Sequence, residues 1–330
     1  MVRKKLGLAV LALVVVAPFL IQSCGSSPSS PAPAATSTPT SSFTPTITST
    51  PTLTFTPTPF TQQATISLGT LHPYTIRTAP NGNIWILQQS PALLMQITSA
   101  GATAIAPVSV FNTSESFSNP SGIAVDPASG DVYVADTNNG RVVIFDSSGS
   151  WLEDFGSTQI YCGCDAGIAV NAAGTTVYVG KNGVPSSELV YSVAAGSPPT
   201  VTYQTAIGPG VAGGLGGNVN GQVVDGSGNL YVTDWYNNRV VKYNGSGTYQ
   251  LAVTLASLGS PLDVAVDLSG NIFPFDTHNG TIVEFNPSGQ YLNSVTGAWN
   301  GASDIALDTT GNLIYLSELA GSQLDVYKIH

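Results

Sequence analysis

A stretch of 33 residues constrains the fold more than any other part of this chain. Residues 120–152 read PSGIAVDPASGDVYVADTNNGRVVIFDSSGSWL. Three short apolar runs, rich in β-branched residues, alternate with turns of Asp, Pro, Asn and Gly: Ile123–Val125, Val132–Ala135 and Val142–Phe145. Trp151 opens a fourth run. Runs of this composition, separated by turns of this composition, indicate four short antiparallel β-strands.

The same unit recurs along the chain. A glycine turn followed by an aromatic residue occurs six times, and successive aromatic residues lie 42 to 53 positions apart. They are Trp85, Tyr133, Tyr178, Tyr231, Phe273 and Tyr315. A period of roughly 40 to 50 residues with four strands in each unit is typical of β-propeller blades. The sequence therefore predicts one all-β domain over residues 62–330, a six-bladed β-propeller with four antiparallel strands in each blade.

Residues 120–150 resemble an NHL repeat. The pattern of that repeat runs Pro-x-Gly-Ile-Ala-Val-Asp, then Tyr-Val-Ala-Asp, then Asn-x-Arg-Val and Phe, and the other copies keep less of it. The resemblance implies an NHL-like propeller in which Asp136 with Arg141, and Asp234 with Arg239, form ion pairs that brace turns. It is specific for the fold and says nothing about activity.

The last copy ends at its third strand, Leu324–Ile329, which leaves that blade one strand short. Ala64–Gly69 precedes the first copy and resembles the fourth-strand stretch Leu251–Leu258. We expect it to pair beside the C-terminal strand and close the ring, because a free strand edge is an aggregation site.

The N-terminus has the pattern of a secretion signal. Arg3, Lys4 and Lys5 precede an uncharged run that ends at Ile21, which is short for a transmembrane helix of about 20 residues. The run leads into Leu-Ile-Gln-Ser before Cys24, which resembles the box of bacterial lipoproteins. We expect a signal peptide over residues 1–23 and lipid on Cys24, with an ordinary cleaved signal as the alternative. The resemblance implies a lipid-anchored protein of the bacterial cell envelope, at the outer membrane if there is one, and otherwise on the outer face of the cytoplasmic membrane.

Residues 24–61 contain mainly Ser, Thr and Pro and carry no charge. Such a segment cannot bury enough apolar surface to fold, so we interpret it as a tether. Removal of residues 1–23 leaves six basic side chains against nineteen acidic ones, a formal net charge of −13. Nucleic acid is excluded as a partner, because its binding needs clustered cations. We expect the protein to be a monomer.

Cys162 and Cys164 flank one glycine and are the only other cysteines. Outside the cytoplasm a close pair favours a local disulfide, although the ring across one residue is strained. Two free thiols and half of a metal site are the alternatives. The metal site is the weakest of the three, because zinc pairs have two to four intervening residues.

Loops after the second and fourth strands of each blade lie on one rim, which is the usual ligand face of a propeller. The longest of these connections, residues 208–221, is rich in glycine and is a candidate lid. The residues of this rim that we expect to bind a ligand are His72, Asp165, Asn218, Asn220, Trp235, Tyr236, Asp263, His278 and Asp304.

Alignment of the innermost strands predicts a ring of equivalent positions around the channel mouth. They are Gly122, Gly167, Gly221, Asp263 and Asp304, with Tyr74 or Thr75 completing the ring. Two carboxylates beside three glycines favour one of two interpretations. They hold a polar ligand or a divalent cation such as Ca²⁺, with Asn carbonyls nearby, or they accept backbone hydrogen bonds where their strands begin.

The sequence contains no Ser/His/Asp elbow and no phosphate-binding loop. We therefore expect a non-catalytic module that binds a protein, peptide or glycan, with Trp235 as an apolar anchor and Asp263 and Asp304 fixing a polar group. The alternative for Trp235 is that it only packs against the loop of the next blade. The alternative is a metal-dependent hydrolase or lyase at the channel mouth, because similar propellers include gluconolactonase-like hydrolases and streptogramin lyases. His278 would be the histidine of such a lyase.

Overall fold

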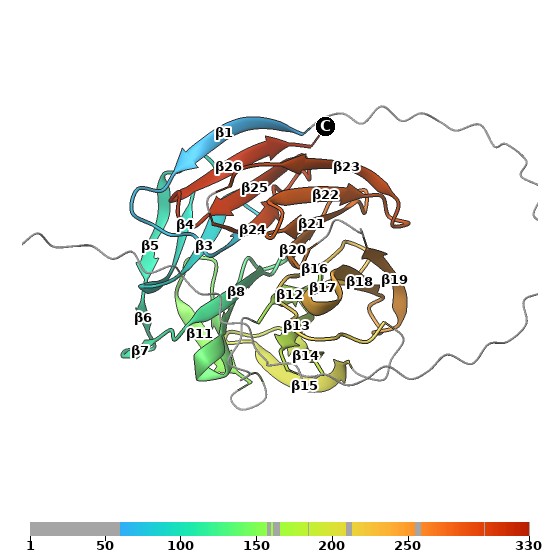
Figure 1. The fold of residues 1–330 in the computed structure, drawn as a ribbon. Coiled ribbons are helices and arrows are strands. Elements are labelled where there is room, and N and C mark those ends of the chain that lie inside the picture. Colours follow the sequence, from blue (N-terminus) through green and yellow to red (C-terminus); the bar gives the residue numbers. More distant parts are fainter. Residues whose placement is uncertain are drawn as a thin grey trace, which may run out of the picture.

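Six four-stranded antiparallel sheets follow one another around a common axis, so the chain folds into a six-bladed β-propeller, as the sequence predicted (Figure 1). The structure, a computed structural model, describes residues 60–156, 160, 166–183, 185–208, 213–254, 259–299 and 301–329. The expected signal peptide, Cys24, nearly all of the tether, Cys162, Cys164 and Asp165 lie outside these residues. Within them, no helix has both the length and the apolar character needed to cross a membrane.

Blades 1 to 3 each run outward from the axis in chain order. Their strands are β2 (Thr75–Thr78), β3 (Ile84–Gln89), β4 (Ala92–Ile97) and β5 (Thr103–Val108); β8 (Pro120–Val125), β9 (Val132–Asp136), β10 (Arg141–Phe145) and β11 (Trp151–Phe155); and β12 (Ile168–Val170), β13 (Thr176–Lys181), β14 (Ser187–Ala194) and β15 (Thr200–Ile207). A two-stranded hairpin, β6 (Val110–Phe111) and β7 (Glu115–Ser116), lies between blades 1 and 2 in the sequence.

Blades 4 to 6 complete the ring. Their strands are β16 (Gln222–Val224), β17 (Leu230–Asp234), β18 (Arg239–Tyr243) and β19 (Tyr249–Thr254); β20 (Pro261–Val266), β21 (Ile272–Asp276), β22 (Thr281–Phe285) and β23 (Tyr291–Thr296); and β24 (Ala302–Leu307), β25 (Leu313–Glu318), β26 (Gln323–Lys328) and β1 (Thr61–Ser67). Single 3-10 turns follow the second strands of blades 2 and 4, as η1 (Thr137–Asn139) and η2 (Trp235–Asn237).

The core lies between neighbouring blades. In β9, Tyr133 and Ala135 pack in the cluster shared with blade 3, whereas Val132 and Val134 pack in the cluster shared with blade 1. Successive side chains of a strand point to opposite faces, so a strand between two neighbours is apolar at every position. This is why the second strands read as continuous hydrophobic runs.

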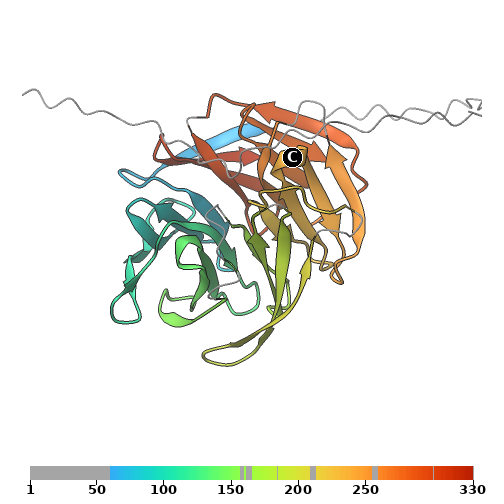
Figure 2. The ribbon, with the colours of Figure 1, turned by 60° about the horizontal axis from the view of Figure 1, so that its bottom comes forward.

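Blade 6 contains both ends of the described chain. β1 pairs antiparallel with β26, and the blue N-terminal strand lies beside the red C-terminal strands in both ribbon views (Figures 1 and 2). Ile66 and Leu68 pack in the core shared with blade 1, and Phe60 packs edge-on against Phe273 at 6.3 Å between ring centroids. The folded part therefore includes Phe60, two residues before the expected boundary at residue 62.

The rim opposite the expected ligand face consists of repeated turns. Asp225 and Asp267 each accept hydrogen bonds at 2.8 to 2.9 Å from the backbone N–H groups two and four residues further on. Asp126 and Asp308 make similar turn contacts. These four carboxylates therefore stabilise turns, which is a common role for Asp at such positions.

Candidate functional site

The innermost strands meet near the axis through one equivalent position in each blade. These positions are Thr75, Gly122, Gly167, Gly221, Asp263 and Asp304. A register shift directly precedes Gly122, Asp263 and Asp304 in the pairing of the first and second strands. A β-bulge redirects the side chain that follows it, and here it turns the position toward the next blade. The predicted ring is therefore present, with Thr75 as its sixth member.

In three blades this position brings two backbones into contact. A β-carbon at Gly122 would lie 2.6 Å from the carbonyl oxygen of Ala166, and one at Gly167 would lie 2.4 Å from that of Asn220. At Gly221 it would lie 2.4 Å from the α-carbon of Asp263. We call these three contacts the glycine joints, because only a residue without a side chain allows the approach.

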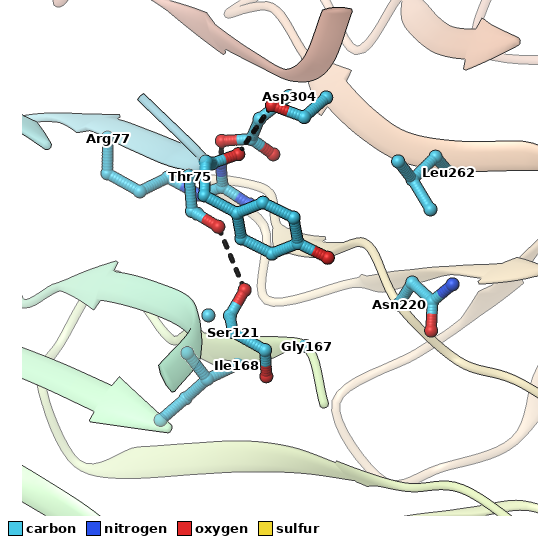
Figure 3. A pocket seen from close by; sticks show the side chains of 11 residues that line it. Thr75, Arg77, Ser121, Gly167, Ile168, Asn220, Leu262 and Asp304 are labelled. Carbon is cyan, nitrogen blue, oxygen red and sulfur yellow. Dashed lines mark hydrogen bonds and ion pairs between the residues drawn. The ribbon is translucent and has the colours of Figure 1, made fainter. Parts of the chain in front are cut away.

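In the other three blades the position carries a side chain that bonds to the next blade. The Thr75 hydroxyl donates to the backbone oxygen of Ser121 at 2.8 Å (Figure 3). Asp263 accepts from the backbone N–H of Ile305 at 3.3 Å, and Asp304 accepts from that of Ile76 at 2.6 Å. The second interpretation of the sequence, backbone acceptors, therefore describes both carboxylates.

Arg77 lies between the two carboxylates. Its Nη1 donates to Oδ2 of Asp304 at 2.7 Å, and its Nη2 lies 3.3 Å from Oδ1 of Asp263. Figure 3 shows Arg77 and Asp304 together on one side of the channel mouth. Burial lowers the pKa of Arg77, but the two carboxylates outweigh it and leave the pKa above its usual value. The cation that lies between these two carboxylates in the structure is therefore a side chain of the chain itself.

One guanidinium faces two carboxylates, which leaves excess negative charge in a buried place. Asp263 is 2% exposed and Asp304 is 5% exposed. Burial raises the pKa of Asp304 well above its usual range, Arg77 opposes this, and the neighbouring Asp263 adds to it. We call Arg77, Asp263 and Asp304 the charged joint, since it links blades 5, 6 and 1.

The channel mouth has little free space. The cavity lined by Thr75, Ser121, Asn220 and Asp304 has a volume of about 20 Å³, which is room for a water molecule and not for an organic ligand. In the described part of the chain, His, Cys, Asp and Glu side chains nowhere gather in a group of three or more that could hold a metal ion. Within the charged joint, the partners of Asp263 and Asp304 are Arg77 and the backbone N–H groups of Ile305 and Ile76.

Arg77 was not predicted from the sequence, although a signal was present. The equivalent position in the other five copies holds a small or β-branched apolar residue, namely Ala124, Ala169, Val223, Ala265 or Ala306. A charged residue at a position that is otherwise apolar needs a partner of opposite charge within reach. Among the six ring positions, only those of blades 5 and 6 carry a carboxylate, at Asp263 and Asp304.

The second group of predicted residues lies on the rim of blade 4. The Asp234 carboxylate pairs with Nε of Arg239 at 2.8 Å, which confirms the expected brace and fixes η2 between them. The rings of Trp235 and Tyr236 meet at right angles with centroids 5.1 Å apart, and Tyr236 is 41% exposed. The backbone N–H of Trp235 donates to the backbone oxygen of Asn218 at 3.3 Å, so Asn218 helps to hold the turn that carries the aromatic pair.

This surface continues onto blade 5. Oδ1 of Asn238 accepts from the backbone N–H of Ser260 at 2.9 Å. A β-carbon at Gly259 would lie 3.1 Å from Cδ2 of His278, so the backbone at residue 259 contacts the exposed His278 ring. We call the surface of Trp235, Tyr236, Asn238, Ser260 and His278 the aromatic patch.

The predicted residues therefore divide into separate groups. Asn220, Asp263 and Asp304 lie at the channel mouth, whereas Trp235 and His278 lie on the rim. His72 is exposed on the connection into β2, and its Nδ1 lies 2.8 Å from the Leu319 carbonyl oxygen. The expectation that Trp235 and the two carboxylates hold one ligand together is not supported, since the carboxylates are buried in the charged joint.

Comparison with known proteins agrees with the fold. Residues 117–145 match the NHL repeat. Virginiamycin B lyase from Staphylococcus aureus is similar in structure with a TM-score of 0.58 and 12% identity, over 82% of this chain and 100% of the lyase. A chain of a nidogen/laminin complex is similar with a TM-score of 0.53 and 12% identity, over 68% of this chain and 80% of that one. No curated protein matches the sequence.

At these identities the likeness extends to the fold alone. One similar structure is a lyase and the other belongs to a complex of two proteins, so propellers of this shape occur both in enzymes and in binding proteins. The function has to be argued from the residues of this chain.

Proposed function

We propose that the propeller is a non-catalytic binding module that takes its ligand on the rim formed by the loops after the second and fourth strands. The observation that carries the proposal is the aromatic pair of Trp235 and Tyr236, which is partly exposed on this rim although buried positions for aromatic rings are plentiful between the blades. Exposed aromatic residues held in fixed positions are frequent anchors of recognition surfaces. The filled channel mouth supports a site on the rim.

The alternative, a metal-dependent hydrolase or lyase, needs a substrate cavity and an ion. The small volume at the channel mouth argues against the first, and the pairing of Asp263 and Asp304 with Arg77 argues against the second. Metal analysis of the purified protein distinguishes the two functions. A stoichiometric ion that survives dialysis would overturn the binding module in favour of the enzyme.

Binding to isolated cell envelopes tests the binding module directly. We expect the double variant Trp235→Ala with Tyr236→Ala to lose binding while its melting temperature stays within a few degrees of the wild type. Tyr291→Ala is the matched control, because Tyr291 is 51% exposed on the outer strand of blade 5 and away from the rim. Equal binding by all three proteins would contradict the proposal.

We also propose that lipid on Cys24 anchors the protein, with the segment up to residue 61 as a tether. The direction of β1 supports this arrangement. Thr61 pairs with Lys328 and Ser67 pairs with Gln323, so β1 begins on the rim opposite the aromatic patch. A chain that leaves from there keeps the aromatic patch clear of the attachment. Replacement of Cys24 by Ala should release the protein from membranes, and membrane retention of that variant would refute the anchor.

A further inference from the structure

We propose that the aromatic patch binds a neutral glycan, an inference that rests on the proposed function and names its ligand class. The patch consists of Trp235, Tyr236, Asn238, Ser260 and His278, which lie on two neighbouring blades. The argument has three parts: a rigid aromatic surface, unused hydrogen-bonding groups beside it, and the lack of exposed charge.

The aromatic pair is held in place from within the protein. A β-carbon at Gly217 would lie 2.5 Å from Cδ2 of Tyr236, so bare backbone packs against that ring. The Trp235 ring meets the same ring at 90°. Part of each ring still faces solvent, since Trp235 is half-buried and Tyr236 is 41% exposed. A rigid aromatic surface binds the C–H face of a sugar at small entropic cost, because little side-chain freedom is lost.

Polar groups beside the rings have no hydrogen bond to another described residue. They are the indole N–H of Trp235, the amide nitrogen of Asn238 and both ring nitrogens of His278. Asn238 is nevertheless oriented, because its Oδ1 accepts from the Ser260 N–H. A sugar presents alternating hydroxyl donors and acceptors, and these groups include both donors and, in neutral histidine, an acceptor.

The patch carries no exposed carboxylate, ammonium or guanidinium group among its described residues. The charged side chains nearest to these residues in the sequence already have partners. Asp234 pairs with Arg239, and Asp276 accepts hydrogen bonds from the backbone N–H groups of Gly259 and His278. This lack of charge contrasts with the chain as a whole, which has 19 acidic residues. A charged peptide or anionic polymer would find no partner for its charges here, whereas a neutral glycan needs none.

Binding of neutral oligosaccharides to the full-length protein tests the inference. The probes are maltoheptaose, cellohexaose and chitotetraose, followed by an array of neutral glycans, and the readouts are tryptophan fluorescence and saturation-transfer NMR. We expect binding of at least one neutral glycan, with affinity lowered at least tenfold in Trp235→Ala. His278→Ala and Asn238→Ala should lower the affinity about threefold each, since each removes one polar contact. Tyr291→Ala should bind as the wild type does.

The outcomes separate this inference from the proposed function. If no neutral glycan binds but envelope binding still depends on Trp235, the glycan inference is wrong and the binding rim stands. If a glycan binds equally well to Trp235→Ala and to the wild type, its site lies elsewhere and the inference is also wrong. If neither envelope binding nor glycan binding depends on Trp235, both proposals are wrong. A lysine-rich peptide that binds at Trp235 would identify a protein ligand instead.

Discussion

The joints between blades differ on the two sides of the ring. From blade 2 to blade 5, successive inner strands touch through Gly122, Gly167 and Gly221, and the contact is backbone against backbone. Around blade 6 the strands are connected through Asp263, Asp304 and the guanidinium of Arg77. The same position thus provides close packing on one side and an ionic network on the other.

The position of the charged joint follows the path of the chain. Blades 1 to 5 are each made from one continuous segment, whereas blade 6 combines β24 to β26 with β1 from the other end of the described chain. Neighbouring blades joined by a short loop find each other locally, but the contact between blades 6 and 1 closes a long loop at an entropic cost. Asp304 accepts from the backbone N–H of Ile76 at 2.6 Å across that closing contact, so a charge-assisted hydrogen bond lies where chain connectivity contributes least.

Of the changes considered, removal of β1 should lower the stability of the propeller most. A chain that starts at residue 71 loses the buried side chains of Phe60, Ile66 and Leu68 and leaves the edge of β26 unpaired. Each such side chain contributes about 1.5 to 3 kcal/mol when fully buried, so we expect a strong loss of stability or insoluble protein. Thermal melting of this chain beside one that starts at residue 60 provides the measurement. An unchanged melting temperature would show that β1 does not close the ring.

Arg77→Met should have the next largest effect. It removes the cation from between two carboxylates that are nearly inaccessible to solvent, and loss of one partner of a buried ion pair costs about 3 to 5 kcal/mol. The free energy of unfolding in urea is the measurement. The triple variant with Asp263→Asn and Asp304→Asn serves as the control, because it removes the uncompensated charge as well. It should recover part of the loss, whereas a loss that stays the same would assign the effect to the packing of the arginine stem.

The two kinds of joint differed in how far the sequence revealed them. The ring of glycines and carboxylates could be predicted, because repeated copies align position by position and each copy has the same register. The ion pairs of Arg77 could not be predicted, because they depend on how the ring closes. Asp263 lies 186 positions and Asp304 lies 227 positions after Arg77 in the sequence. The sequence analysis did not predict that the two carboxylates are buried beside Arg77.

The aromatic patch shows the same limit. Trp235 and Tyr236 were predicted on the rim because they occupy a turn whose place in the blade is fixed by the repeat. Asn238 and residues 259–260 connect these rings to His278 on the next blade. The repeat pattern does not predict this contact, because it depends on a loop between two blades. Contacts within a blade follow from the repeat, and contacts between blades require the structure.

A glycine joint can be tested by the addition of a single methyl group. Gly167→Ala would place its β-carbon 2.4 Å from the backbone oxygen of Asn220, so blades 3 and 4 have to move apart. Overpacking of this kind costs about 1 to 3 kcal/mol, and we expect the upper end because the clash is with backbone. Gly226→Ala is the matched control, since nothing lies within 4 Å of that position. Equal melting temperatures for the two variants would rule out close packing as the role of Gly167.

The side of the ring with glycine joints also contains a buried carboxyl group that has no ion-pair or hydrogen-bond partner among the described residues. Glu188 of β14 is fully buried, and neither of its oxygens has a hydrogen-bond partner in the part of the chain that the structure describes. The amide oxygen of Gln222 on blade 4 also has none, while its amide nitrogen donates to the Tyr178 backbone oxygen at 3.3 Å. Burial raises the pKa of Glu188 well above its usual 4.5. In contrast to Asp304, no cation lies beside it in the described residues.

Glu188→Gln should have the smallest effect and the clearest dependence on pH. In the wild type, a raised pKa in the folded state means that the folded chain holds this proton more tightly than the unfolded chain, so stability is lost as pH rises above about 4.5, the usual pKa of the carboxyl group. Glutamine stays neutral, so the variant should match the wild type near pH 4 and exceed it by about 1 kcal/mol at pH 8, where the wild type buries an unpaired group. Urea unfolding at both pH values measures the difference. A variant less stable than the wild type at pH 8 would mean that the Glu188 carboxylate has a partner of positive charge, and the contrast between the two sides of the ring would then disappear.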